Sequence, residues 1–537
     1  MKIDSVSRDV FQHEVVSVAE EMSAALRRSA FSAIIWDMID YACGLLDPQG
    51  NTIAQAPTIP AQLGIMPTAF RHMIRHIPLS EWQEGDVIIC NDPYLGCTHT
   101  PDIVLFSPVF FEGRIIAIAS TVAHHIDVGG RVPGSESATA REIFEEGLRI
   151  PPLKLFDRGQ PNDTFFKIFA RNVRDPKAST GDINAQVAAC RTAERRLKDL
   201  AAKYGADGFA AHVAAVFDYS EAFLRGALAE VEQNQARAEI LIEDDAASAE
   251  PMRLAVSIAV ENGGLTVDFA GTSAQRPNGL NNPYASTLSM VHYAVKVVFT
   301  PDLPQNEGCN RPVRVIVPEG TILNPREPAA VSVRHLTQQA VADVVLKALA
   351  AIAPEASTAG CQISFPTFVI GGFDQRAGVV SRNGGDAPYF VVTDIIGGGM
   401  GASASADGIS GVDTHGGNCA ILSAEVLETT SPVRAVSTRL VTGSGGRGQH
   451  SGGLAIEREY EMLSSGLVVS GYTQQTRPET APWGLAGGEP GGLAAVHIIR
   501  RNGEAEALTS KFVAVPLEQG ERLRLRAAGG AGWGKPG

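Results

Sequence analysis

Five side chains that could bind a metal ion or move a proton fall within residues 91–130. They are His99, Asp102, His124, His125 and Asp127. Imidazole and carboxylate groups hold catalytic divalent metals in many enzymes, and they often leave one position open for water. The segment therefore predicts a metal site in an enzyme or an enzyme subunit. The alternative is that these are ordinary core or loop residues, because their spacing matches no established metal signature.

Two apolar runs must position this group. Residues 103–110 and 115–123 are strand-like and flank a short Glu112-Gly113 turn, which predicts a β-hairpin. Pro101 favours an extended backbone at Thr100, so the HxxD pair begins a strand and not a helix. The hairpin would carry both ends of the group to one edge of a sheet.

Strand alternation leaves the choice between the two adjacent histidines open. Successive side chains point to opposite faces, so His125 and Asp127 share one face while His124 takes the other. One histidine would be a metal ligand, and the other would orient a ligand or contact the substrate. Local geometry does not say which is which.

Composition narrows the class of protein. A chain of 537 residues predicts two to four domains, and a net charge of −14 argues against non-specific nucleic-acid binding. The seven cysteines form no CxxC pair, which favours reduced thiols over a zinc cluster or a disulfide framework. No apolar run approaches the ~20 residues of a membrane span. These features, with a polar N-terminus, predict a soluble cytoplasmic protein.

Periodicity predicts an α+β, multidomain fold with mixed sheets. An amphipathic helix is expected over residues 7–29 and a strongly helical segment over 161–235, with further helices over 285–300 and 335–353 and a short one at 139–150. An NGG turn between alternating runs near residue 262 predicts a second hairpin. We expect four regions: an N-terminal α+β region with the metal loops, a helical segment, an α+β middle region and a glycine-rich, strand-rich C-terminal region. Their bounds are 1–160, 161–236, 237–355 and 356–537.

Two further features favour structural roles. The glycine clusters at 397–401 and 443–453 lack the order of a P-loop, so turns or close backbone approach explain them better than nucleotide binding. His335 starts a predicted helix, where capping or core packing is a simpler role than catalysis.

Ordered blocks of the chain resemble the hydantoinase B/oxoprolinase family. They run from about residue 8 to the end and include NDPYLGCTHTPD, AHHIDVGGRVPGS, EIFEEGLRIPPLKL, NVRDPKASTGDINAQVAACRTAERRL, NEGCNRPVRVIVPEGTILNP, SGGRGQHSGGLAIEREY and GGAGWG. The resemblance implies the B-type component of an ATP-dependent cyclic amidohydrolase of the hydantoinase, N-methylhydantoinase or 5-oxoprolinase type. It also implies a heteromer, dimerised as in relatives, with an actin-like hydantoinase A-type ATPase partner that binds ATP with magnesium.

The resemblance also implies the ligands. In carboxylase relatives an HxxD pair and a later histidine hold a divalent metal, which by position are His99, Asp102 and His124. Asp127 would be a fourth ligand or would support the site. Cys97 replaces a glycine often found before the TH pair, which affects the expected substrate preference more than metal binding.

The expected reaction is opening of a hydantoin, 5-oxoproline or lactam-type ring. The partner would phosphorylate the amide carbonyl, and water activated by zinc, manganese or iron would then attack it. His125 or Asp127 would accept the proton. The alternatives are a component of an ATP-dependent ketone carboxylase and a non-catalytic scaffold. Neither the ring, the metal nor the stoichiometry follows from the sequence.

Overall fold

A seven-stranded antiparallel sheet carries the segment with the five candidate side chains. The computed structural model describes residues 3–379 and 387–537. The sheet has the order β2-β1-β5-β4-β3-β6-β7. Its strands are β1 (Tyr41–Leu46), β2 (Thr52–Gln55), β3 (Val87–Cys90), β4 (Asp102–Phe111), β5 (Arg114–His124), β6 (Leu153–Asp157) and β7 (Gln160–Pro161). The two longest strands, β4 and β5, form the predicted hairpin at its centre.

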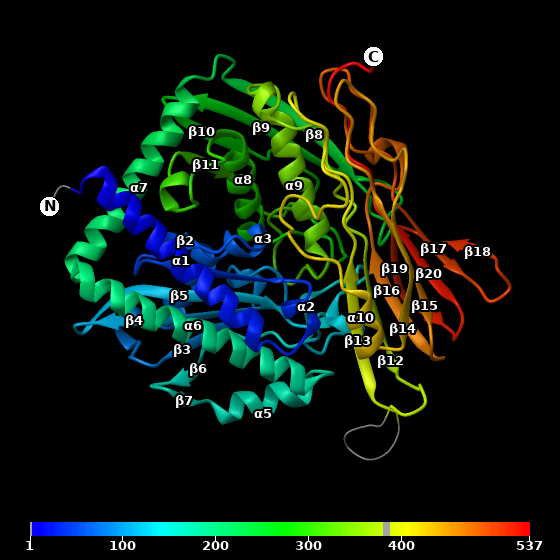
Figure 1. Cartoon of the computed structure of the whole chain (residues 1–537), viewed down its shortest axis with the longest axis horizontal. Helices are drawn as coiled ribbons and strands as arrows, with labels where there is room; N and C mark the ends of the chain where they lie inside the picture. Colours follow the sequence, from blue (N-terminus) through cyan, green and yellow to red (C-terminus); the bar gives the residue numbers. More distant parts are fainter. Residues whose placement is uncertain (1–2, 380–386) are drawn as a thin grey trace.

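Long helices cover one face of this sheet. They are α1 (Ser5–Ser29), α5 (Asp163–Asn172), α6 (Pro176–Tyr204) and α7 (Ala206–Ala229). Helix α6 packs across β4 and β5, and α1 lies along α6 (Figure 1). The first and second predicted helical segments are thus confirmed.

The other face of the sheet is covered by short helices and by the middle of the chain. Four short or medium helices, α2 (Ala33–Trp36), α3 (Pro60–Leu63), α4 (Met66–His76) and α8 (Tyr284–Phe299), precede the buried helix α9 (Arg334–Leu349). Helix α9 packs on α8 and on a four-stranded sheet with the order β11-β10-β9-β8. Its strands are β8 (Gln235–Ile242), β9 (Met252–Glu261), β10 (Gly264–Asp268) and β11 (Val313–Ile316). The hairpin predicted at the NGG turn is β9–β10.

Two further sheets form the C-terminal part (Figure 1). One has the order β13-β12-β16-β19, with β12 (Thr367–Phe373), β13 (Tyr389–Ile395), β16 (Leu467–Tyr472) and β19 (Lys511–Leu517). The other has the order β14-β15-β20-β17-β18, with α10 (Ala424–Thr430) beside β14 (Val433–Leu440), β15 (Ile456–Met462), β17 (Ala495–Ile499), β18 (Ala505–Ala507) and β20 (Arg522–Arg526). The glycine clusters allow backbones to meet: a Cβ on Gly399 would lie 2.0 Å from the Gly453 oxygen.

The fold is α+β and multidomain, as predicted, but residues 139–150 do not form the expected helix. Only Ile143–Glu145 makes a 3-10 turn, closed by a capping box between Glu142 and Glu145. Gly147 then adopts a φ of +104°, which ends any helical path. The four-region division stays a prediction. In the structure, the helices of residues 163–229 complete the layer over the first sheet.

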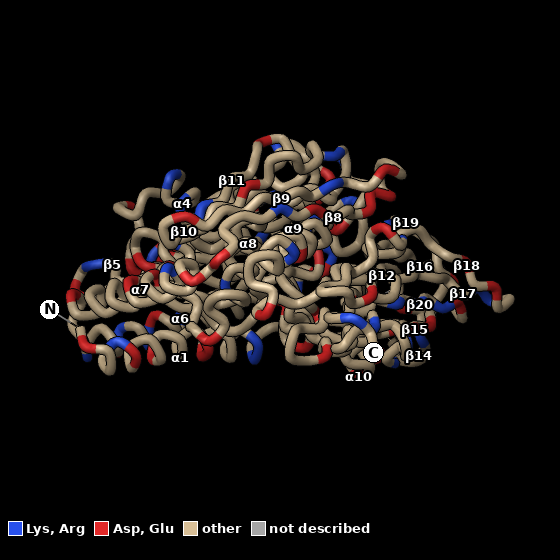
Figure 2. The backbone as a smooth tube through the Cα atoms, turned by 90° about the horizontal axis from the view of Figure 1, so that it is seen from above, with Lys and Arg blue, Asp and Glu red and all other residues tan. Residues whose placement is uncertain are grey.

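Charged residues of both signs are interspersed along the chain, as the view from above shows (Figure 2). Within residues 3–379 and 387–537, every helix is too short or too polar to cross a membrane.

Candidate metal centre

Three predicted ligands meet in one tight triangle. The β4–β5 ladder pairs Asp102 directly with His124, and His99 lies in the loop that leads into β4. His99 Nε2 lies 3.2 Å from His124 Nδ1 and 3.3 Å from Asp102 Oδ1, and the last two atoms are 3.1 Å apart. A tetrahedral ion with bonds of about 2.0–2.1 Å separates its donors by roughly 3.3–3.4 Å. The triangle therefore fits a divalent transition metal.

Neighbouring groups aim the donor atoms at a common point. The Ser332 carbonyl accepts a hydrogen bond from His99 Nδ1 at 2.9 Å, which turns Nε2 toward the triangle. Thr98 and Arg334 donate to Asp102 Oδ2 at 2.5 and 2.8 Å, and this leaves Oδ1 for the triangle. Such outer contacts fix the tautomer and orientation of metal ligands.

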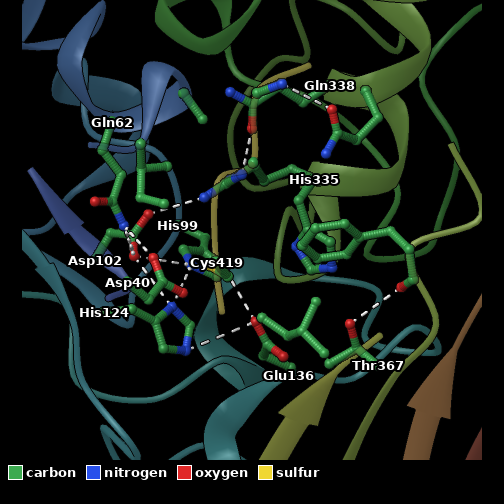
Figure 3. Close-up of a pocket in the computed structure, with 18 of the residues that line it drawn as sticks. Asp40, Gln62, His99, Asp102, His124, Glu136, His335, Gln338, Thr367 and Cys419 are labelled. Carbon is green, nitrogen blue, oxygen red and sulfur yellow. Dashed lines mark hydrogen bonds and ion pairs between the residues drawn. The ribbon is translucent and has the colours of Figure 1, made fainter. Parts of the chain in front are cut away.

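The triangle lies at one end of a cavity between the first sheet, α9 and the C-terminal part (Figure 3). Two more carboxylates line it. Asp40 accepts a hydrogen bond from Gln62 at 2.8 Å, and Glu136 accepts one from the Tyr472 hydroxyl at 2.7 Å. Glu136 Oε1 is 3.7 Å from His99 Nδ1. Together with His335, Glu136 and His99 form a second group of possible metal donors, which shares His99 with the first.

Burial and neighbouring charges set the protonation of the cavity. Burial alone would lower the pKa of His124, but Asp102, Asp40 and Glu136 raise it to about 9. Burial raises the pKa of Asp40 to about 6. Burial also pushes the pKa of His335 well below its usual value, with help from Arg334, so this imidazole is neutral. A metal ion must displace a proton from His124, which makes its binding pH-dependent.

His125 and Asp127, the expected proton acceptors, face away from the cavity. His125 Nε2 lies 3.1 Å from Gln186 Oε1 on α6. Asp127 is fully buried and accepts hydrogen bonds from the Arg174 side chain and from the Arg174, Gly129 and Gly134 backbone. The alternation argument placed them correctly on the face opposite His124. It also means that a proton-accepting role in this cavity does not fit their position.

The structure adds residues to the site that the sequence did not assign to it, and several come from α9. Arg334, His335, Gln338 and Gln339 all line the cavity, as do Asp40, Gln62 and Glu136. His335 is therefore more than a core residue. A signal was present: α9 is buried on nearly every side yet carries several polar residues. Buried polar groups need partners, so such a helix predicts a polar site.

The chain and its fold belong to a known class of protein. The chain is a member of the hydantoinase B/oxoprolinase family, whose sequence profile matches residues 4–536. It is 31% identical to a putative D-/L-hydantoinase component, of the B type, from Pseudomonas sp. (strain NS671), with 100% of this chain and 90% of that one covered. It is 32% identical to 5-oxoprolinase 1 of Arabidopsis thaliana, over 99% of this chain but only 42% of that protein.

Solved structures agree with this assignment. The ATP-dependent caprolactamase from Pseudomonas jessenii superposes with a TM-score of 0.89 at 27% identity, over 100% of this chain and 92% of that one. A nucleotide-free acetone carboxylase shares the fold, with a TM-score of 0.88 at 18% identity, over 98% of this chain and 75% of that one. The protein is thus related to enzymes of ATP-dependent hydantoinase, oxoprolinase and lactamase type.

Proposed function

We propose that this chain is the metal-binding component of an ATP-dependent cyclic amidohydrolase. An A-type ATPase partner activates the amide carbonyl of a hydantoin, 5-oxoproline or lactam-type ring by phosphorylation, and this chain holds the site where the ring is opened. The observation that carries the proposal is the His99–Asp102–His124 triangle, whose 3.1–3.3 Å sides suit a metal ion and which opens into a cavity. Membership of the family supplies the class of reaction.

Different residues of the cavity would bind the metal ion and transfer protons. His99, Asp102 and His124 would hold zinc, manganese or iron, because two imidazoles and a carboxylate suit all three. Such an ion supplies Lewis acidity and lowers the pKa of water. Asp40 and Glu136 line the cavity and are the carboxylates placed to hold a proton, so we assign proton transfer to them instead of His125 and Asp127.

The first experiment is elemental analysis of the purified chain and of three variants. We expect about one equivalent of transition metal in the wild type, little in His99→Ala and Asp102→Ala, and an unchanged content in His13→Ala, which alters an exposed histidine of α1. Equal metal contents in all four proteins would refute the assignment of the ligands.

The second experiment tests the reaction with the A-type partner present. Ring opening that requires ATP, and that is lost in His99→Ala and Asp102→Ala, would support the proposal. ATP turnover that requires bicarbonate and a ketone would instead assign the chain to a carboxylase. Full activity of the complex with a metal-free chain would leave only a scaffold role.

A further inference from the structure

Three neutral polar atoms on the walls of the cavity have no hydrogen-bond partner among the described residues. They are Gln62 Oε1, Gln338 Nε2 and His335 Nε2. Their residues are only 2%, 1% and 8% exposed, respectively. A buried polar atom without a partner costs free energy, so its retention at the wall of a cavity points to a ligand that satisfies it.

The hydrogen-bond network fixes which way the two glutamines point. The Gln62 amide nitrogen donates to Asp40 Oδ1 at 2.8 Å and to Asp102 Oδ1 at 3.3 Å, so the remaining atom must be the acceptor oxygen. The Gln338 oxygen accepts from Arg334 Nη1, so the remaining atom must be the donor nitrogen. Gln62 and the α9 residues lie on different sides of the cavity (Figure 3). One wall therefore offers an acceptor and the other a donor.

The charges of the cavity do not suit a second anionic group. Its lining includes the carboxylates of Asp40, Asp102 and Glu136. Among the described residues that line it, Arg334 is the one lysine or arginine, and its guanidinium is already bound to Asp102 and Gln338. The proposed metal ion would balance the charge of a phosphorylated carbonyl. No free positive charge is then left, among the described lining residues, for a carboxylate on the ring.

We propose that the cavity selects uncharged cyclic amides, with Gln62 as an acceptor and Gln338 as a donor for the neutral polar atoms of the activated ring, and discriminates against rings that carry a carboxylate. The inference rests on the proposed function and narrows its substrates. The ring nitrogens and carbonyls of a lactam or an unsubstituted hydantoin are neutral polar groups that suit the two walls. The carboxylate of 5-oxoproline would lie among like charges without a cationic partner, which is unfavourable in a buried site.

The test compares two rings that differ only in the carboxylate: 2-pyrrolidinone and 5-oxoproline. With the A-type partner and ATP, we expect kcat/KM to favour 2-pyrrolidinone by at least about tenfold. Asp40→Asn removes one negative charge from the wall and keeps the acceptor for Gln62. It should slow the opening of both rings, because Asp40 is also assigned proton transfer, and it should lower their kcat/KM ratio about threefold or more. Asp207→Asn, at a side chain that is 93% exposed, is the matched control and should leave the ratio unchanged.

Gln338→Met gives a second readout that does not depend on Asp40→Asn folding. It removes the donor, together with the oxygen that accepts from Arg334, with little change in size, so the KM for 2-pyrrolidinone should rise several-fold. An unchanged KM would overturn the role of Gln338.

Each outcome of the substrate comparison decides between the two proposals. Equal or better use of 5-oxoproline would overturn the selectivity but leave the amidohydrolase function standing. A large ratio that Asp40→Asn does not alter would place the discrimination in the partner protein and overturn its assignment to this cavity. Ring opening that does not require ATP would overturn the proposed function and the inference with it. So would a failure to open 2-pyrrolidinone, 5-oxoproline and hydantoin alike.

Discussion

Replacing Thr98 by valine isolates one contact that orients Asp102, a proposed metal ligand. Thr98 is fully buried, and its hydroxyl donates to Asp102 Oδ2 at 2.5 Å. Valine keeps the shape of the side chain and removes only this donor. A hydrogen bond to a charged acceptor contributes about 1.5–3 kcal/mol, and each 1.4 kcal/mol corresponds to tenfold in affinity. Because Arg334 still donates to the same oxygen at 2.8 Å, we expect the loss to lie at the lower end of this energy range, which corresponds to an approximately tenfold loss of metal affinity.

The assay is a competitive titration of zinc or manganese against a chromophoric chelator at fixed pH. Thr100→Val is the matched control, since Thr100 is equally buried in the same loop but donates to the Glu146 carbonyl at 2.7 Å and not to Asp102. Both variants should lose some thermal stability, and only Thr98→Val should lose metal affinity. The reasoning fails if Thr98→Val binds metal within twofold of the wild type, or if Thr100→Val loses as much affinity.

Three other predictions concern stability around the site. Asp127→Asn should lower the unfolding midpoint by several degrees yet keep the metal content of the wild type, because Asp127 binds Arg174 away from the cavity; calorimetry and elemental analysis check this, and lost metal would contradict it. Gly129→Ala should destabilise the chain far more than Gly113→Ala: both glycines have positive φ, but a Cβ would lie 2.1 Å from the Asn172 oxygen at Gly129 and meets nothing within 4 Å at Gly113. Similar midpoints for the two variants would refute the clash. Burial raises the pKa of Glu146 from 4.5 to about 8, so between these pH values the native state binds a proton that the unfolded state has lost. The contribution of this carboxyl to the free energy of unfolding is complete below about pH 4.5 and is lost as pH rises toward 8. The free energy of unfolding, measured by chemical denaturation, should therefore fall between pH 5 and 8 by at most about 1.4 kcal/mol per pH unit, and the fall should be smaller in Glu146→Gln. Parallel pH curves for the two proteins would rule out this linkage.

The parts of the fold that depend on local pattern could be predicted from the sequence. The apolar runs around Glu112-Gly113 give the β4–β5 hairpin, and the pairing of Asp102 with His124 follows from it. The helices near residues 163–229 follow from local pattern in the same way, and α9 is also expected as a helix although it is buried on nearly every side. Alternation also placed His125 opposite His124.

The walls of the cavity could not be predicted in this way, because they come from distant parts of the chain. Arg334 reaches Asp102 across 232 positions of sequence, and the Tyr472 hydroxyl reaches Glu136 across 336. No local rule links such residues; only packing of α9 and of the C-terminal sheet against the first sheet brings them together. The short turn at Ile143–Glu145 was misjudged for a related reason, since side-chain capping decided it and not helical periodicity.

The spacing of the triangle has a consequence for how the chain folds. All three side chains lie within residues 99–124, but the β4–β5 hairpin pairs only Asp102 with His124 by local contacts, while His99 lies in the loop before β4 and is held by the distant Ser332 carbonyl. Arg334 is synthesised roughly 10–40 s after His124 at ordinary rates of translation. During that interval the Asp102–His124 pair can form in a nascent chain, but the proposed site is completed only after Ser332 and Arg334 have been made and hold His99 and Asp102.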